Sequence, residues 1–233
     1  MKKRLILGVM FVAMLNGVLA GSDKDGTKVY LYEVDVGSGG NAFMENMYLV
    51  VRKDDMSAII IDPGNTSEKM ERFIARKEIQ VRAVLNTHGH FDHIGANSHY
   101  AKLYNVPVWC SAADKGMFVN ENKKNMPTDF FDEDQTLTLD EFEVKVITTP
   151  GHSPGSACFL IGGNLFSGDT LFKEGIGRTF GNEVQKRESR KQEIGNIKRK
   201  LLILPRDTEV YPGHGEDTRI KYEARDNPHL QRD

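Results

Sequence analysis

The segment from Thr87 to Gly95 reads Thr-His-Gly-His-Phe-Asp-His-Ile-Gly and places three imidazoles and one carboxylate within six residues. Imidazole nitrogen and carboxylate oxygen are the ligands that zinc and similar divalent metals prefer. A helix brings positions three and four apart onto one face, but His88, His90 and Asp92 follow one another at intervals of two. We therefore expect a loop or strand end that turns into a helix, with ligands pointing in two directions toward two metal ions. A solvated polar loop is the alternative interpretation.

Two further histidines lie in short loops bounded by glycine and proline. His152 is in the segment 149–155 and His214 is in the segment 211–215. Such turns constrain the backbone, which suits a preorganised metal ligand, although a turn histidine at the surface is the commoner case. His99 and His229 have no comparable setting, and we predict that both are ordinary surface residues.

The N-terminal 20 residues differ in composition from the rest of the chain. Three basic residues precede an apolar run from position 5 to position 20, and small residues stand where a signal peptidase cleaves. This layout predicts a signal peptide over residues 1–20 and a secreted or periplasmic protein, with an N-terminal membrane anchor as the alternative. After cleavage we expect no stable membrane insertion. The loss of three positive charges changes the formal charge from −2 to −5, which argues against a nucleic-acid partner.

The remaining length is typical of one globular domain, which we place at residues 28–229. Cys110 and Cys158 lie in apolar stretches and are predicted to be buried free thiols. Hydrophobic periodicity predicts helices over 67–77, 92–104 and 189–202, and a polar loop over 119–135. Strands are expected at 29–36, 47–52, 57–61, 81–85, 106–110, 142–148, 157–161, 164–167 and 209–211. Each candidate ligand then follows a strand end, where sites are commonly built.

The ordered pattern His88-x-His90-x-Asp92-His93, followed by His152, Asp169 and His214, resembles the signature of the metallo-β-lactamase superfamily. The resemblance implies an α/β fold, a four-layer αββα metallo-β-lactamase-like sandwich of two mixed β-sheets flanked by helices. An Asp at position 169 is typical of the glyoxalase II-like branch. The commonest antibiotic-hydrolysing enzymes carry Cys there, so we do not expect that activity.

The resemblance also assigns roles to the seven residues. His88, His90 and His152 would bind a first metal, and Asp92, His93 and His214 a second, while Asp169 would bridge both. Taken alone, Asp169 after a strand could equally be a helix cap. The expected cofactors are two Zn2+ ions per chain, with iron or manganese as the alternative in one or both sites. A water shared by two metals becomes acidic enough to act as a hydroxide near neutral pH, and Asp92 is expected to orient it.

The segment 175–180, Gly-Ile-Gly-Arg-Thr-Phe, corresponds to the glutathione-contacting segment of glyoxalase II. Arg178 and Phe180 are therefore the predicted substrate-binding residues, because an arginine can hold a carboxylate with two hydrogen bonds. Phe180 stands where glyoxalase II has a tyrosine, so the hydroxyl that would contact glutathione is missing. Only 19 residues follow His214, and we expect a short glyoxalase II-like form without the C-terminal helical domain.

Three functions remain open on these residues. The first is a binuclear metal-dependent hydrolase acting on a small molecule, an anionic acyl thioester as in hydroxyacylglutathione hydrolases, or a related ester or lactone. The second is a persulfide dioxygenase with one iron, because such enzymes resemble this chain in the first ligand group and in Gly177-Arg178-Thr179. The third, a structural zinc protein, fits poorly because structural sites are usually closed, four-coordinate and rich in cysteine. The sequence does not indicate an oligomeric state.

Overall fold

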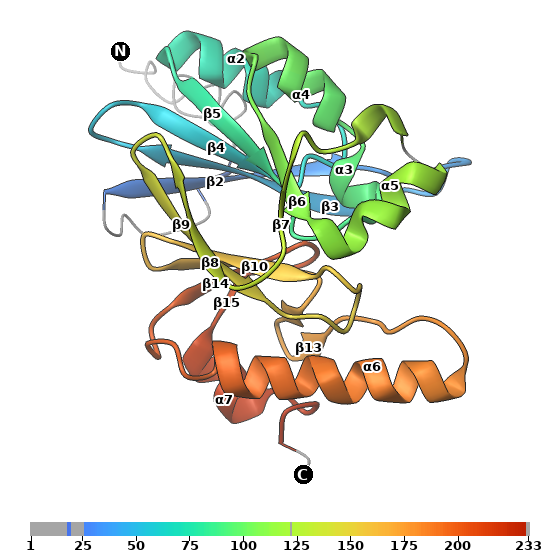
Figure 1. Ribbon diagram of the computed structural model, residues 1–233. Coiled ribbons are helices and arrows are strands. Elements are labelled where there is room, and N and C mark those ends of the chain that lie inside the picture. The colour runs from blue at the N-terminus through green and yellow to red at the C-terminus, as the bar shows by residue number, and fades with distance from the viewer. Residues whose placement is uncertain (1–17, 20–25, 122, 232–233) are drawn as a thin grey trace, which may run out of the picture.

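Two mixed β-sheets face each other at the centre of the molecule, and helices cover their outer faces (Figure 1). The structure is a computed structural model and describes residues 18–19, 26–121 and 123–231. Helices α2 and α4 lie on the outer side of the first sheet, and α6 and α7 lie on the outer side of the second (Figure 1). The predicted four-layer αββα sandwich is therefore confirmed.

The first sheet contains seven strands that neighbour one another in sequence order. The four N-terminal strands pair antiparallel, and the pairs from β4 to β7 are parallel. The strands are β1 (Val18–Leu19), β2 (Thr27–Asp35), β3 (Met44–Arg52), β4 (Ser57–Ile61), β5 (Gln80–Leu85), β6 (Val108–Ser111) and β7 (Asp129–Phe131).

The second sheet contains six strands, in the order β15, β14, β11, β10, β9, β8. All neighbours pair antiparallel except β11 and β14, which are parallel. The strands are β8 (Gln135–Leu139), β9 (Phe142–Thr148), β10 (Ala157–Ile161), β11 (Asn164–Gly168), β14 (Glu209–Pro212) and β15 (Thr218–Arg219). A separate ribbon of β12 (Leu171–Phe172) and β13 (Gly175–Ile176) follows β11 and leads into the predicted substrate segment.

The helices fall into two groups: the first precedes β7 and includes α2 and α4 on the outer face of the first sheet, and the second follows β13 and covers the outer face of the second sheet. The first group is α2 (Glu68–Lys77), α3 (Phe91–Ile94), α4 (Asn97–Tyr104), α5 (Lys115–Glu121) and the short 3-10 turns η1 (Ala112–Asp114) and η2 (Lys123–Asn125). The second group is α6 (Glu183–Asn196), its π-helical continuation η3 (Ile197–Leu201) and α7 (Ile220–Asp226).

Strands β3, β4, β10, β11 and β14 are buried on both faces, which accounts for their continuous apolar runs. Along β4, Ile59 and Ile61 point between the two sheets, whereas Ile60 points to the cluster under α2 and α4. This alternation is the two-residue period of a strand. A third apolar cluster, containing Leu165 and Ile197, joins the second sheet to its helices. The two sheets are thus held as one rigid support for the loops at their strand ends.

The predicted helix over 92–104 is in fact two helices. It is interrupted at Gly95 and Ala96, because the backbone N–H of Ala96 donates to Pro63 O over 2.8 Å instead of to its own helix. Gly95 packs closely against the turn that follows β4, and a Cβ at this position would lie 2.1 Å from Gly64 O. The break keeps α3 short and fixes it against the end of β4.

Two other expectations about secondary structure were wrong. The segment 119–135 is not a loop, since it contains the end of α5, the turn η2 and strand β7. Phe118 of α5 packs in a small buried cluster with Ile94 and Cys110, and β7 pairs with β6, so distant contacts order this polar stretch. Helix α6 begins at Glu183 rather than at 189, because Asn182 and Gln185 form a capping box.

The predicted signal peptide, residues 1–20, lies outside the described residues except for Val18 and Leu19. Within the part of the chain that the structure describes, no helix has both the length and the apolarity to cross a membrane. Cys110 and Cys158 are buried free cysteines, as predicted.

Candidate metal centre

Three of the predicted ligands converge as one group at the end of the sandwich. His88 and His90 leave the loop between β5 and α3, and His152 lies in the loop between β9 and β10. His152 Nε2 lies 3.2 Å from His88 Nε2 and 2.8 Å from His90 Nδ1. The structure therefore brings together residues separated by more than sixty positions, in a set that could hold one metal ion.

The other three ligands form a second group beside the first. Asp92 and His93 come from α3, and His214 follows β14. Asp92 Oδ2 lies 3.4 Å from His214 Nε2 and 3.8 Å from His93 Nε2. The turn from strand end to helix sends His88 and His90 to one group and Asp92 and His93 to the other, which is the geometry that the spacing of the cluster indicates.

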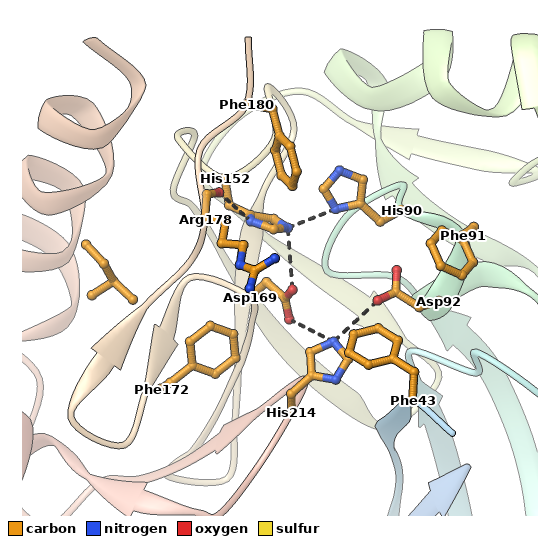
Figure 2. Close-up of a pocket in the computed structure, with 11 residues that line it drawn as sticks. Phe43, His90, Phe91, Asp92, His152, Asp169, Phe172, Arg178, Phe180 and His214 are labelled. Atoms are coloured by element: carbon orange, nitrogen blue, oxygen red, sulfur yellow. Dashed lines mark hydrogen bonds and ion pairs between the residues drawn. The ribbon is translucent and has the colours of Figure 1, made fainter. Parts of the chain in front are cut away.

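Asp169 lies between the two groups and faces each with one oxygen (Figure 2). Its Oδ2 is 3.5 Å from His152 Nε2, and its Oδ1 is 3.4 Å from His93 Nε2 and 3.7 Å from His214 Nε2. It follows the end of β11 in the loop before β12. This position between the groups is the one expected of a bridging carboxylate rather than of a helix cap.

The chemistry of these donor atoms fits a pair of cations. His152 Nδ1 donates to Arg178 O over 2.8 Å, so its Nε2 presents a lone pair to the nitrogens of His88 and His90. The Thr87 hydroxyl donates to Asp62 Oδ2 and can therefore accept from His88 Nδ1, which leaves a lone pair on His88 Nε2 as well. Two lone pairs that face each other over the 3.2 Å between His88 and His152 repel unless a cation lies between them. Two ligands about 2.1 Å from one tetrahedral zinc lie about 3.4 Å apart, so the observed spacings are close to those of a shared ion.

Unpaired polar atoms in the second group support the same conclusion. His93 Nε2, Asp169 Oδ1 and His214 Nε2 are shielded from solvent and have no hydrogen-bond partner among the described residues. Buried polar atoms are nearly always hydrogen-bonded in native proteins, so three unpaired atoms that face the same point require an explanation. A second bound cation would satisfy all three.

The far ring nitrogens of the histidines are held by the protein. His214 Nδ1 donates to Met44 O over 2.7 Å, and His93 Nδ1 lies 3.1 Å from Asp62 Oδ2. His88 Nδ1 lies 3.1 Å from the Thr87 hydroxyl. Such partners fix the orientation of each ring and commonly accompany metal-binding histidines.

Asp62 directly follows the predicted strand 57–61 and is a functional candidate that was not predicted from the sequence. Besides contacting His93, it accepts hydrogen bonds from the backbone N–H of Thr87 at 2.7 Å and from the Thr87 hydroxyl at 2.6 Å. It therefore ties the end of β4 to the start of the ligand cluster. Its place at the C-terminal end of a buried strand was the available signal.

Asp114 was missed altogether and joins two ligand loops. Its carboxylate accepts from Gly89 N at 2.9 Å, from Gly155 N at 2.7 Å and from Ser153 Oγ at 2.7 Å. Gly89 separates His88 from His90, and Ser153 follows His152. No sequence pattern marks this residue, because its partners are 25 to 41 positions away.

Strand β3 fixes the loop that carries His214. Asn46 Nδ2 donates to Pro212 O at 3.0 Å and to Gly215 O at 2.9 Å, and the Asn46 N–H donates to Gly213 O at 2.8 Å. Gly213 has no room for a side chain, since a Cβ there would lie 2.5 Å from Asp169 Oδ1. The Pro-Gly-His motif is therefore constrained by its neighbours as well as by its own sequence.

Glu45, also on β3, is a second buried acid behind His93. Its Oε1 lies 3.8 Å from His93 Nδ1, and neither of its oxygens has a hydrogen-bond partner among the described residues. Burial raises the pKa of Glu45 well above its ordinary value, so the protonated form is favoured. Asp62 remains the closer partner of His93.

The pKa values of the histidines are shifted in opposite directions in the two groups. Burial lowers them in both, and nearby carboxylates raise them in the second. In the first group, burial lowers the pKa of His88 well below its ordinary value and that of His152 to about 4, so both are neutral and able to act as ligands at neutral pH. Burial also opposes charge on His93, but Asp169 and Asp62 outweigh it and raise the pKa of His93. An extra positive charge is thus favoured at the second group, where carboxylates are present.

The centre opens into a pocket of about 560 Å3. Arg178 and Phe180, the predicted substrate-binding residues, both line it together with five of the seven ligands: His90, Asp92, His152, Asp169 and His214. His99 and His229 lie elsewhere, His99 beside Glu71 at 2.9 Å and His229 beside Arg190 at 3.1 Å. Both agree with the prediction of ordinary surface residues.

An αββα sandwich with two adjacent His/Asp groups at one end of its sheets defines a class of metal-dependent enzymes. The model of the "Metallo-beta-lactamase superfamily" matches residues 40–214. The chain belongs to this superfamily. It is also 33% identical to "Hydroxyacylglutathione hydrolase GloC" of Haemophilus influenzae over 204 residues, which cover 81% of this chain and 94% of that protein.

Two solved structures with similar folds are at least 30% identical to this chain. "BLEG-1 B3 metallo-beta-lactamase" superposes with a TM-score of 0.72 at 30% identity, covering 87% of this chain and all of that one. "TTHA1623 in a di-iron-bound form" superposes with a TM-score of 0.67 at 32% identity, covering 85% of this chain and all of that one. The superfamily and its relatives support a metal-dependent hydrolase with a two-metal centre.

Proposed function

We propose that the protein is a binuclear metal-dependent hydrolase of the glyoxalase II-like type, acting on an acyl thioester or on a related ester or lactone. The observation that carries the proposal is the convergence of two ligand groups on Asp169 at the floor of an open pocket. The similarity to a hydroxyacylglutathione hydrolase over most of both chains supports the thioester.

The bound metals would be zinc, with iron as the alternative that the di-iron relative supports. When bound, such a pair lowers the pKa of a shared water toward neutrality and polarises the carbonyl that the water attacks. The chain's own residues do the rest. Asp92 lines the pocket beside His214 and would accept a hydrogen bond from the attacking water, which orients it. Arg178 would hold an anionic group of the substrate by paired hydrogen bonds.

The proposal is tested with the purified chain after loading with Zn2+ or Fe2+. Turnover is measured on S-lactoylglutathione, a simple thioester, an aryl ester, a lactone and a β-lactam. We expect thioester or ester hydrolysis, with two metals per chain. One metal per chain and no hydrolysis of any substrate would contradict the proposal. Oxygen uptake with glutathione persulfide and a single iron would instead identify a persulfide dioxygenase.

We further propose that residues 1–20 direct export to a secreted or periplasmic location. The basic start and the short apolar run support this. The proposed partner is a small anionic acyl compound, without nucleic acid and without stable membrane insertion after cleavage. N-terminal sequencing of the protein recovered from each cell fraction tests the proposal. A chain that keeps residues 1–20 in the cytoplasm would contradict it.

A further inference from the structure

The pocket above the ligand groups is lined by aromatic rings. Apart from the predicted metal ligands, its lining consists of Phe43, Phe91, Phe172, Ile176, Arg178 and Phe180. Four phenylalanines therefore surround the centre, and Figure 2 shows their rings on different sides of it. We call these four phenylalanines the aromatic rim.

Two rings of the rim lie directly against histidines of the centre, Phe180 at the first group and Phe43 at the second. Phe180 contacts His90 and His152 edge-on, with ring centroids 5.3 Å and 5.5 Å apart. Phe43 stacks on His214 with centroids 4.8 Å apart and an interplanar angle of 28°. A group bound between the phenylalanine rings would thus be next to the reacting centre, not at a remote subsite.

Three rings of the rim are exposed to solvent. Phe43 is 46% exposed, Phe91 56% and Phe180 54%. Single exposed apolar residues are ordinary, but several around one opening mark a binding surface. Phenylalanine has no donor or acceptor, so these rings cannot hold the metals. Covering them removes apolar surface from water, which favours an apolar ligand.

The charged side chains that line the pocket limit how many charges a ligand can carry. Among the described residues that line the pocket and are not predicted metal ligands, Arg178 alone has a side chain that can hydrogen-bond. A flexible peptide-like group with several charges, such as glutathione, would find one cation and otherwise apolar rings. A compact molecule with one anionic group and one aryl or branched alkyl group would find a partner for both.

We propose that the substrate is a singly anionic thioester or ester with an aryl or branched alkyl group, and that the aromatic rim binds this apolar group while Arg178 binds the anion. The inference rests on the proposed hydrolase function and narrows its substrate class. Hydrolysis adds water across the acyl bond, giving a carboxylic acid and a thiol or alcohol, and needs no other reactant.

The first experiment compares three thioesters on the metal-loaded full chain. S-phenylacetyl-3-mercaptopropionate carries an aryl group and one carboxylate, S-acetyl-3-mercaptopropionate lacks the aryl group, and S-lactoylglutathione carries the polar peptide. We expect kcat/KM for the phenylacetyl compound to exceed that of each of the others by about tenfold or more. In Phe43→Ala and Phe180→Ala this preference should fall severalfold, mainly through KM. Ile203→Ala, an exposed apolar residue away from the pocket, is the matched control and should keep it.

The second experiment measures binding without turnover. The thioether S-phenethyl-3-mercaptopropionate has no scissile acyl bond, and its affinity is measured by calorimetry for the metal-free and the metal-loaded chain. We expect Phe43→Ala and Phe180→Ala to weaken binding in both forms, and Ile203→Ala to leave it unchanged.

The outcomes separate the two proposals. The chain could hydrolyse thioesters but prefer S-lactoylglutathione, with the same preference in Phe43→Ala and Phe180→Ala. That result would overturn the proposed substrate class and leave the proposed hydrolase function standing. Absence of all hydrolysis would contradict the hydrolase, and thioether binding then decides whether the rim recognises the apolar anion. Thioether affinity that is equal in wild type and both variants would overturn the inference.

Discussion

The floor of the pocket and its rim are built in opposite ways. On the floor, His88, His93 and His152 are buried and the Nδ1 atom of each is held by a protein oxygen, whereas Phe43 and Phe180 on the rim are about half exposed. The floor is fixed by polar contacts from both sheets, and the rim offers apolar surface and one cation. This difference indicates that separate residues determine the reaction and the choice of substrate. Variants of the floor should therefore lower kcat and metal content, and variants of the rim should mainly raise KM.

The largest effect is expected at Asp169, the residue that both ligand groups share. In Asp169→Asn one negative charge is lost between two cations, and we expect kcat to fall by about 10^3-fold or more with loss of at least one metal. Turnover and metal content measure this. Asp132→Asn, at an exposed acid in the β7–β8 loop, is the control. Unchanged metal content and turnover in Asp169→Asn would contradict the proposal that Asp169 bridges the two metals.

A smaller and more selective effect is expected at Asp62. Asp62→Asn should weaken the hydrogen bond to His93 and lower metal affinity at the second group by about 10- to 100-fold, while the first group keeps its metal. Titration with a competing chelator resolves the two affinities, and circular dichroism checks the fold. Equal weakening of both metals would show that Asp62 supports the fold rather than one ligand.

On the rim, Arg178→Gln should affect binding more than chemistry. We expect KM for an anionic thioester to rise about tenfold, with little change in kcat or metal content, because a charge-assisted contact is lost outside the metal groups. Added salt should reduce the difference from wild type. Arg187→Gln, on the exposed face of α6, is the control. A fall in kcat at constant KM would place Arg178 in the reaction instead.

The smallest effect on activity is expected at Glu193, a buried acid of α6 that lies beside Gly177 and does not line the pocket. Burial raises the pKa of Glu193 to about 8, against the lowering influence of Arg190 and the Gly177 N–H. The folded state then holds a proton that the unfolded chain releases near pH 4.5, so stability should fall between pH 4.5 and 8, by at most about 1.4 kcal/mol per pH unit. Urea unfolding at several pH values should show a flatter profile for Glu193→Gln. If the stability of wild type and of Glu193→Gln depends on pH in the same way, the raised pKa of Glu193 is contradicted.

The ligand residues could be predicted from sequence because their types and order are local signals. The fold followed from the same resemblance, together with strands whose apolar runs are long enough to detect. Most of what failed was set by contacts between distant segments. The start of α6 is the exception, because its capping box of Asn182 and Gln185 is a local signal. The break at Gly95 depends on Pro63, and α5 and β7 depend on packing and pairing that no local pattern reveals.

The same limit applies to the candidate site. Asp62 and Asp114 act through partners more than twenty positions away, so periodicity and spacing do not reveal their roles. For Asp62 the only sequence signal is its place after a buried strand. Phe43 and Phe172 join the rim only because the β2–β3 loop and the β12–β13 ribbon meet at the pocket. Phe180 was identified because it lies in a motif, whereas rings from other segments required the folded chain.

The central claim is that two metals are bound side by side by two ligand groups. Native mass spectrometry of the metal-loaded chain tests this most directly, with His214→Ala measured beside wild type. We predict two metal ions per wild-type chain and one per His214→Ala chain, since the first group keeps its three histidines. A single ion in the wild type, retained in His214→Ala, would contradict the account.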